Sequence, residues 1–290
     1  MSNDAHDLGV RGPVGVVGLG AMGWPIAQHL RTAGVDVVVT DANPAARDRA
    51  RAEGLTVVDS AAELATRVDA CIASLPTGAI VRQVTDELWS VRPDLLVCDT
   101  STIDPATARE LAARGPHLDT PILGRPAGVG SWTIPVGGAD DLAARAEVLL
   151  APLARRVVRV GDAGAAAVLK VCNNLMLSAI NAVTGEALAL AEASGLDPQT
   201  FVDVVLDSGA ASVSGLFRDV APRAVAGDFD PVFSLALMRK DAQLALDLAA
   251  AQGTPLEVVA ASQRVNDAAI ESGLGAEDSI AVVKSIRAGR

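Results

Sequence analysis

Apolar runs of strand length alternate with stretches of helical periodicity along the first half of the chain. This alternation is typical of β-α-β units, in which parallel strands are buried on both faces and helices connect them. The helical stretches include Ile80–Leu88 and Pro105–Arg114, which are amphipathic and rich in alanine. We therefore expect an α/β fold with a doubly wound parallel sheet, whose first strands are Val14–Val17, Val35–Thr40, Ala70–Leu75, Leu95–Asp99 and Leu118–Leu123.

The pattern changes in the second half of the chain. Two further strand-like runs, Trp132–Val136 and Arg156–Val160, flank a helical stretch at Asp140–Ala151. After them only helical periodicity remains, and it begins with a long apolar stretch without proline, Ala165–Ala193. We expect an N-terminal α/β domain over residues 1–164, with a polar tail over residues 1–12, followed by an all-α domain over residues 165–290.

Composition narrows the function classes. The net charge of −11 over 290 residues argues against nucleic acid or an anionic membrane as the partner. We expect no uninterrupted apolar stretch of transmembrane length and no signal peptide. The three cysteines, Cys71, Cys98 and Cys172, lie in apolar runs without the spacing of metal ligands. They are therefore expected to be buried free thiols in a reducing cytoplasm, and we expect no metal site.

A glycine-rich motif follows the first predicted strand and opens a helix. Gly18 permits a tight turn, Gly20 allows a pyrophosphate to approach the backbone, and Gly23 lets helix and strand pack closely. The N-terminus of the helix then offers free N–H groups to the phosphates. Asp41 ends the second strand about 20 residues further on, where a carboxylate binds ribose hydroxyls. The motif predicts dinucleotide binding, and Asp41 favours NAD over NADP, although Arg47 could weaken this preference.

Lysine is rare in this chain, which carries its positive charge almost entirely on arginine. The three lysines are Lys170, Lys240 and Lys284. A desolvated lysine can exchange a proton near neutral pH, whereas arginine cannot. Lys170 and Asn174 are four residues apart and share one helix face. Codon usage, or a polar pair that caps a helix or joins subunits, would also explain these residues.

The chain lacks other good proton donors. It has no tyrosine, and its histidines, His6, His29 and His117, are poorly placed. If the protein transfers hydride, Lys170 is therefore the best candidate for the acid/base.

Taken in order, these motifs resemble those of the β-hydroxyacid dehydrogenase family, which includes 3-hydroxyisobutyrate dehydrogenases. The family's G-L-G-x-M-G is matched by Gly18, Leu19, Gly20, Ala21, Met22 and Gly23. Its L-P, D-x-S-T, K-x-x-N-N and F-x6-K-D motifs are matched by Leu75-Pro76, Asp99–Thr102, Lys170–Asn174 and Phe233–Asp241.

The resemblance implies a Rossmann domain followed by an all-α domain, with the α-domains of two subunits interlocked in a homodimer or homotetramer. It further implies that Lys170 is the catalytic acid/base and that Asn174 supports it. Leu75, Pro76, Thr102 and Lys240 would contact the cofactor, and Phe233 would line the nicotinamide side of the cleft.

The predicted substrate loop departs from the family pattern. The family's loop usually reads D-x-P-x-S-G-G. This chain has Leu123 in place of the serine and Arg125 in place of the second glycine. A Gly-Arg pair here is similar to that of sulfolactaldehyde reductases. We expect Gly124 and Arg125 to bind the acid group of a small hydroxyacid or aldehyde, because arginine offers bidentate donors. Alternatively, Arg125 points outward and Gly124 alone anchors the acid.

Several functions therefore stay open. The preferred one is the interconversion of a 3-hydroxyisobutyrate-like β-hydroxyacid and its semialdehyde. The alternatives are a 3-sulfolactaldehyde or succinic semialdehyde reductase, an imine reductase, and a non-catalytic NAD-binding module. Retention of Lys170 argues against the last two. A 6-phosphogluconate dehydrogenase would be longer and richer in basic residues.

Overall fold

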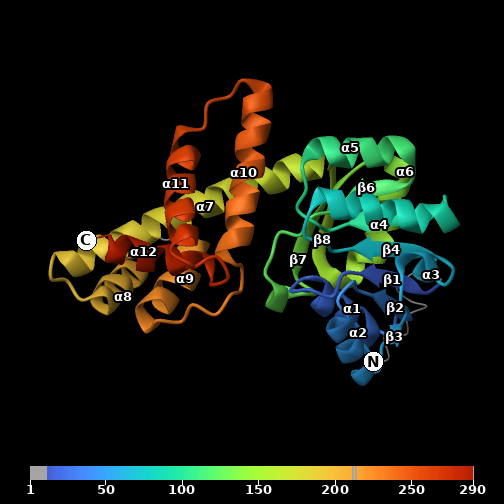
Figure 1. Cartoon of the computed structure of the whole chain (residues 1–290), viewed down its shortest axis with the longest axis horizontal. Coiled ribbons are helices and arrows are strands. Elements are labelled where there is room, and N and C mark those ends of the chain that lie inside the picture. Colours follow the sequence, from blue (N-terminus) through green and yellow to red (C-terminus); the bar gives the residue numbers. More distant parts are fainter. Residues whose placement is uncertain (1–11, 211, 213, 290) are drawn as a thin grey trace. The chain divides into compact units, whose positions relative to one another are not determined.

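The computed structural model describes residues 12–210, 212 and 214–289, and it divides into two compact units, Met1–Lys170 and Val171–Arg290 (Figure 1). Each unit is described by itself. The polar tail expected over residues 1–12 lies outside the described residues except for Gly12, and His6 lies outside them too.

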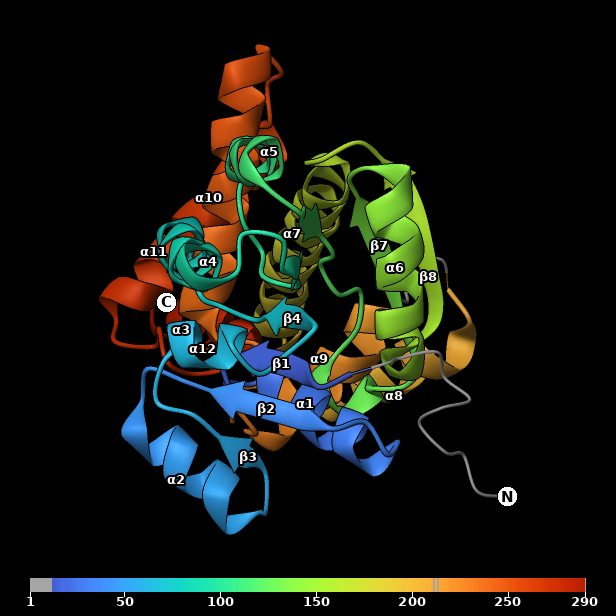
Figure 2. The same cartoon turned by 90° about the vertical axis from the view of Figure 1, so that its right-hand side faces the viewer.

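An eight-stranded sheet with the order β3-β2-β1-β4-β5-β6-β7-β8 forms the centre of the N-terminal unit (Figure 2). Strands β1 to β6 are parallel to one another, as the alternation of apolar runs predicted. Strand β3 is a two-residue edge strand that the sequence pattern did not indicate. The six strands are Val14–Val17, Val37–Thr40, Thr56–Val57, Ala70–Ala73, Leu96–Asp99 and His117–Asp119.

The last two strands run in the opposite direction. Strand β7, Trp132–Gly137, pairs antiparallel with β6, and β8, Ala154–Gly161, pairs parallel with β7. Helix α6, Asp140–Leu150, connects these two strands as a crossover. The β6–β7 loop, residues 120–131, is therefore a return loop at the edge of the sheet where the parallel strands end.

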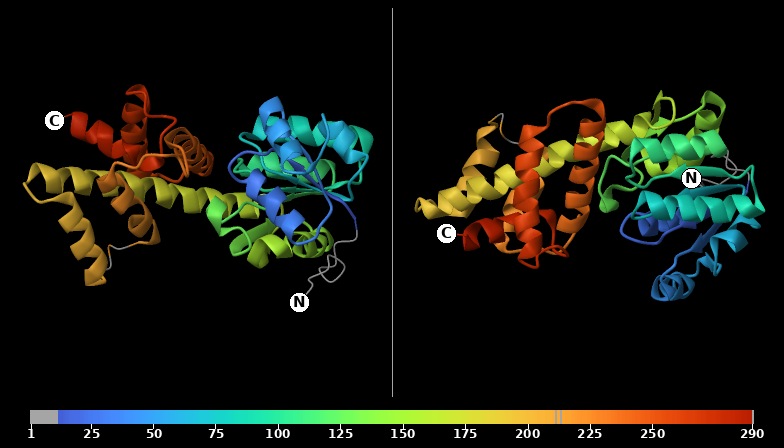
Figure 3. Two further views of the ribbon diagram at one scale, coloured as in Figure 1. Left: turned by 90° about the horizontal axis from the view of Figure 1, so that it is seen from below. Right: turned by 45° about the horizontal axis from the view of Figure 1, so that its top comes forward.

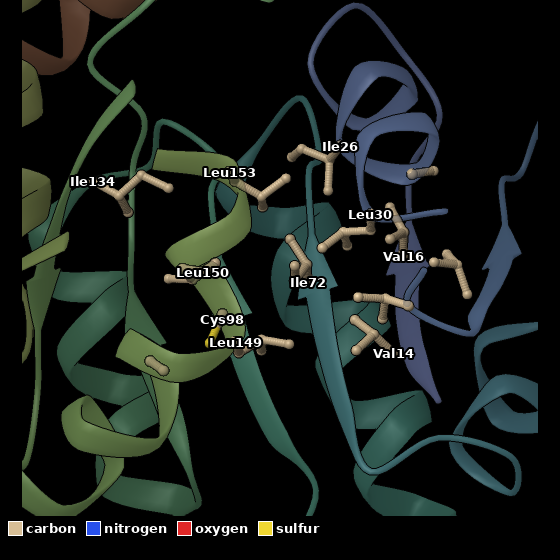
Figure 4. Packing of buried hydrophobic residues seen from close by; sticks show 14 of the residues in the cluster. Val14, Val16, Ile26, Leu30, Ile72, Cys98, Ile134, Leu149, Leu150 and Leu153 are labelled. Atoms are coloured by element: carbon tan, nitrogen blue, oxygen red, sulfur yellow. The ribbon is translucent and has the colours of Figure 1, made fainter. Parts of the chain in front are cut away.

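Alternating side chains of the strands build two cores. Val14 and Val16 of β1 face one core, whereas Val17 faces the other. Figure 4 shows the first core, in which Ile26 and Leu30 of α1 pack beside β1 and β4. Helices α1, α2 and α6 contribute to this core, and α3, α4 and α5 cover the opposite face. The remaining helices of this unit are α1 Gly23–Thr32, α2 Pro44–Ala52, α3 Ala61–Ala65, α4 Gly78–Val91 and α5 Pro105–Arg114.

The described residues of the C-terminal unit form helices and connecting loops, with no β-strand, as expected. Helix α7 runs from Ala165 to Ala193, which are the bounds that the sequence predicted. Helices α10 and α11 pack side by side, and α11 packs on α12 (Figure 3). The other helices are α8 Pro198–Ser208, α9 Gly215–Ala226, α10 Leu235–Gln252, α11 Glu257–Glu271 and α12 Val282–Ala288.

Helix α7 is long and apolar enough to resemble a membrane-spanning helix. By length and composition it could cross a membrane. The expectation concerned uninterrupted apolar stretches, and Lys170, Asn174 and Glu186 interrupt this one. One such helix is weak evidence for a membrane, because core helices pass the same test. Buried polar residues on α7 bind its neighbours, as Asn181 donates to Ser279 Oγ at 2.5 Å and Ser178 accepts from Asn266 at 3.1 Å.

Candidate functional site

The glycine turn after β1 has the conformation that dinucleotide binding requires. Gly18 has a φ of 92°, and a Cβ there would overlap the carbonyl oxygen of Ser74. A Cβ on Gly23 would overlap the carbonyl oxygen of Gly18. Around Gly20, in contrast, no described atom lies within 4 Å of the Cβ position. Two glycines are therefore required by the protein's own packing, whereas Gly20 leaves open space at the helix end.

The same helix end has free anion-binding capacity. The N-cap of α1, Met22, makes no side-chain hydrogen bond to the helix, and its first turn has no acidic residue. The Asp41 carboxylate accepts the Leu19 N–H at 2.6 Å and the Asn43 N–H at 2.7 Å. This arrangement fixes the acid beside the glycine turn, so the residues present fit an NAD(P) dinucleotide.

Arg47 lies close to this acid but is engaged by the backbone. Its Nη1 donates to the Asp41 carbonyl oxygen at 2.6 Å and to that of Ala42 at 3.3 Å.

The loops that follow β4 and β5 brace each other. The Leu75 N–H donates to Ser101 Oγ at 2.8 Å, and the Ser101 N–H donates to Asp99 Oδ1 at 2.9 Å. This contact joins the Leu75-Pro76 turn to the Asp99–Thr102 loop, which sequence reasoning treated as separate motifs. Ser101 is thus a positioning residue that the sequence pattern contained but did not single out.

A buried carboxylate holds the start of α7. Asp119, at the end of β6, is 2% exposed and accepts the N–H groups of Gly164 and Ala167, both at 2.8 Å. Burial raises the pKa of this carboxyl above its ordinary value, and the backbone donors partly offset that rise. The C-terminal end of the sheet therefore fixes the turn of α7 that precedes Lys170.

Lys170 contacts the predicted substrate loop directly. Its Nζ donates to the Ile122 carbonyl oxygen at 2.7 Å, and both residues belong to the N-terminal unit. Two residues further along this loop, Gly124 is exposed, and Arg125 is half-buried. The structure thus brings the candidate acid/base and the candidate anion-binding segment together.

In the C-terminal unit, one buried carboxylate joins two other predicted site residues. Asp241, 2% exposed, accepts from Asn174 Nδ2 at 2.5 Å and forms an ion pair with Lys240 Nζ at 2.9 Å. Asn173 also donates to Asn174 Oδ1 at 3.0 Å. Asp241 was noted only as part of the Lys240-Asp241 motif, and its contact with Asn174, 67 residues earlier, has no local sequence signal.

Phe233 belongs to a different part of this unit. Its backbone is held by Asp278, whose Oδ2 accepts the Phe233 N–H at 3.3 Å, and by Ser279, whose N–H donates to the Phe233 carbonyl at 2.9 Å. The half-buried side chain is therefore carried on a braced segment.

The cysteines correct one expectation. Cys71 and Cys98 are buried, and burial raises the pKa of Cys98 to about 12 and that of Cys71 further. Cys172 is exposed, because its position on α7 does not face the core. The described residues contain no cluster of potential metal ligands.

The parallel sheet and its glycine turn define a Rossmann-type dinucleotide-binding protein, and comparisons with known proteins identify its family. Residues 13–161 match the family model of the NAD-binding domain of 6-phosphogluconate dehydrogenase, and residues 164–286 match a model described as "NAD-binding of NADP-dependent 3-hydroxyisobutyrate dehydrogenase".

Relatives of similar length support this assignment. The chain is 37% identical to a probable 3-hydroxyisobutyrate dehydrogenase of Mycobacterium bovis, over 95% of this chain and 98% of that one. It is 33% identical to the L-threonate dehydrogenase of Cupriavidus necator, over 93% and 95% of the two chains. A structure of the Mycobacterium tuberculosis 3-hydroxyisobutyrate dehydrogenase with L-serine superimposes with a TM-score of 0.84 at 33% identity, covering 95% and 99% of the two chains. The chain belongs to the β-hydroxyacid dehydrogenase family of NAD(P)-dependent oxidoreductases that act on CH–OH groups.

Proposed function

We propose that this protein interconverts a short-chain β-hydroxyacid, similar to 3-hydroxyisobutyrate, and its semialdehyde, with Lys170 as the acid/base. The hydrogen bond of 2.7 Å from Lys170 Nζ to the Ile122 carbonyl carries the proposal. This bond keeps the Lys170 ammonium, the proposed proton donor, beside the β6–β7 loop, whose sequence departs from the family pattern. The relatives support the substrate class, because 3-hydroxyisobutyrate, L-threonate and L-serine all carry a carboxylate and a hydroxyl group.

Each site residue has a distinct task in this reaction. The Lys170 ammonium donates a proton to the carbonyl oxygen of the semialdehyde, and in the reverse direction the amine accepts the hydroxyl proton. Asn174, oriented by Asp241, donates to the substrate, and the Gly124-Arg125 segment binds its acid group. The nicotinamide, when bound, supplies or accepts the hydride.

The test of this mechanism is Lys170→Met. We expect kcat to fall by about 10²- to 10⁴-fold while NADH affinity stays near that of the wild type, because the lysine acts on the carbonyl and not on the dinucleotide. Lys284→Met is the matched control, since Lys284 pairs with Glu277 at 2.8 Å outside the proposed site. If Lys170→Met keeps most of its activity, Lys170 is not the acid/base.

Arg125 sets the second part of the proposal. We expect Arg125→Ala to raise KM for anionic substrates by about tenfold or more with a smaller change in kcat, because a remote anion contact contributes mainly to ground-state binding. Arg155→Ala, at an exposed arginine of β8, is the control. Following NADH absorbance with C3–C4 semialdehydes and 3-sulfolactaldehyde separates a carboxylate preference from a sulfonate preference.

We also propose NAD as the preferred cofactor. The fixed Asp41 carboxylate supports this, since it favours a ribose 2′-hydroxyl and repels a 2′-phosphate.

Self-association is the third part of the proposal. Met176, Val183 and Leu190 of α7 are 61%, 57% and 69% exposed and are spaced seven residues apart, so they lie on one helix face. An exposed apolar face of this kind supports burial against a second copy of the chain. Light scattering should give a dimer or tetramer at micromolar concentration, and Val183→Asp should shift it toward monomer. A monomer in both cases, or binding of the wild type to lipid vesicles, would contradict the proposal.

A further inference from the structure

A buried tryptophan lies directly under the predicted substrate loop. Trp132 is the first residue of β7, is 1% exposed, and donates its indole N–H to the Arg125 carbonyl oxygen at 2.7 Å. Two backbone hydrogen bonds between Leu123 and Thr133, at 2.9 and 3.3 Å, close the β6–β7 loop next to Trp132 in the chain. The loop is therefore folded around this one side chain.

The indole also determines which residue fits at position 124. A Cβ on Gly124 would overlap the ring at Cδ1 and lie 2.8 Å from Nε1. A Cβ on Gly128 would lie 3.4 Å from the same nitrogen. Glycine at 124 is thus required by the backbone's close approach to the indole.

These contacts fix the backbone of the two residues that would bind the substrate's acid group. Arg125 is extended, with φ −104° and ψ 160°, and its carbonyl is directed at the indole. With the carbonyl held, rotation about ψ of Arg125 is restricted, so the backbone from which the side chain projects is fixed. A backbone segment held in this way loses less conformational freedom when it binds an anion.

We propose that Trp132 is a positioning residue that sets the substrate specificity of this enzyme, because it holds the Gly124-Arg125 backbone in the conformation that receives the acid group. This inference rests on the proposed function, in which Gly124 and Arg125 bind that group. It assigns the selection of the anion to a side chain that has no exposed surface of its own.

The chain contains a matched control. Trp89 of α4 donates its indole N–H to the Leu95 carbonyl at 3.0 Å, and a Cβ on Gly115 would lie 2.9 Å from its ring. The two tryptophans thus have the same chemistry, an indole bound to a backbone carbonyl and packed on a glycine. Only Trp132 does so at the β6–β7 loop.

The first experiment compares Trp132→Phe with Trp89→Phe. Phenylalanine keeps most of the apolar volume and removes the N–H donor, so we expect KM for the β-hydroxyacid to rise about three- to tenfold in Trp132→Phe. The kcat and the KM for NAD should stay within about twofold of the wild type, since neither Lys170 nor the glycine turn is touched. Trp89→Phe should leave all three constants unchanged. Equal kinetic changes in both variants, or a fall in kcat alone, would overturn the proposal.

The second experiment tests the contact between ring and glycine. Gly124→Ala should raise the hydroxyacid KM by more than about tenfold, because the methyl group displaces the loop from the ring. Trp132→Leu removes the ring atoms that this methyl group meets, so in that background Gly124→Ala should cost less. The same fold-change in both backgrounds would show that Trp132 does not position residue 124.

Failure of this inference is distinguishable from failure of the proposed function. If Arg125→Ala leaves KM unchanged for every anionic substrate, the anion-binding role itself is wrong. If Arg125→Ala raises KM while the Trp132 variants behave like Trp89→Phe, the function stands and the role of Trp132 is wrong. Thermal unfolding of each variant establishes that folded enzyme is being compared.

Discussion

The N-terminal ends of α1 and α7 lie in the same unit and share two features: N–H groups that have no acceptor within the helix, and the positive end of a helix dipole. They use these features in opposite ways. The first turn of α1 has no side-chain cap, and its glycine turn leaves open space at Gly20. The start of α7 is held by the Asp119 carboxylate, which accepts the N–H of Gly164, just before the helix, and that of Ala167, both at 2.8 Å.

We call the N-terminal end of α1 the open end and that of α7 the closed end. The open end suits the binding of a ligand, whereas the closed end positions the helix itself. An uncapped helix end beside a fixed acid can receive an external phosphate, whereas a helix end that holds an internal carboxylate is closed to ligands and gains stability instead. Lys170, five residues after Ala165, needs a helix that does not fray. The end of α1 is thus suited to binding a phosphate, and the end of α7 to holding Lys170 in place.

The largest expected effect breaks the open end. Gly23→Ala places a methyl group on the Gly18 carbonyl, so the turn cannot keep its shape, and we expect NADH binding to be lost together with part of the stability. Gly20→Ala meets no described atom within 4 Å and should leave the melting temperature unchanged. It should nevertheless weaken NADH binding by about tenfold or more, because the methyl group occupies the path of the pyrophosphate. Calorimetric titration with NADH measures both, and tight binding by Gly20→Ala would contradict the role of the open end.

The next effect breaks the closed end. Asp119→Ala leaves two buried N–H groups without acceptors, and we expect a loss of about 2–4 kcal/mol in the free energy of unfolding. Asp104→Ala is the control, since Asp104 caps α5 from a half-exposed position and accepts the Thr107 N–H at 2.8 Å. It should cost about 1 kcal/mol. Equal losses in urea denaturation would show that the Asp119 contacts are ordinary capping.

The sequence predicted the residues at the open end of α1, but it did not predict the contacts at the closed end of α7. Gly18, Gly20, Gly23 and Asp41 lie within one β-α-β unit, where spacing along the chain fixes spacing in space. Asp119 reaches Gly164 across 45 residues, and no periodicity specifies such a contact. For the same reason the sequence predicted the bounds of α7 and the parallel strands β1 to β6, whereas the antiparallel direction of β7 and the contact between Trp132 and Gly124 emerged only from the structure.

Lowering the pH should destabilise the fold around β6, which carries His117 two residues before Asp119. Burial lowers the pKa of His117 to about 4, although Asp99 Oδ2 lies 3.9 Å from its Nε2. Between pH 6.5 and 4 the unfolded chain therefore binds a proton at this residue that the folded chain does not. The contribution of neutral, buried His117 to the free energy of unfolding is therefore fully present above pH 6.5, and the free energy of unfolding should fall by up to about 3 kcal/mol toward pH 4.

The raised pKa of Asp119 acts in the opposite sense, since the folded state then binds the proton more readily and gains stability as pH falls through that pKa. His117→Leu should flatten the decline between pH 6.5 and 4 in denaturant titrations. An unchanged slope in that variant would assign the acid sensitivity to other groups.

The smallest effect concerns which dinucleotide the open end prefers. Asp41 binds the Leu19 and Asn43 N–H groups, and a carboxylate in this place repels a 2′-phosphate. We expect the wild type to use NAD at least about tenfold more efficiently than NADP in kcat/KM, which corresponds to about 1.4 kcal/mol. Asp41→Asn keeps an acceptor for the backbone and removes the charge, so the ratio should approach one, mainly through a lower KM for NADP. Asp36→Asn, at an exposed acid just before β2, is the control and should leave the ratio unchanged. Equal use of both cofactors by the wild type would mean that Arg47, despite its hydrogen bonds to the Asp41 and Ala42 carbonyls, turns to meet the phosphate.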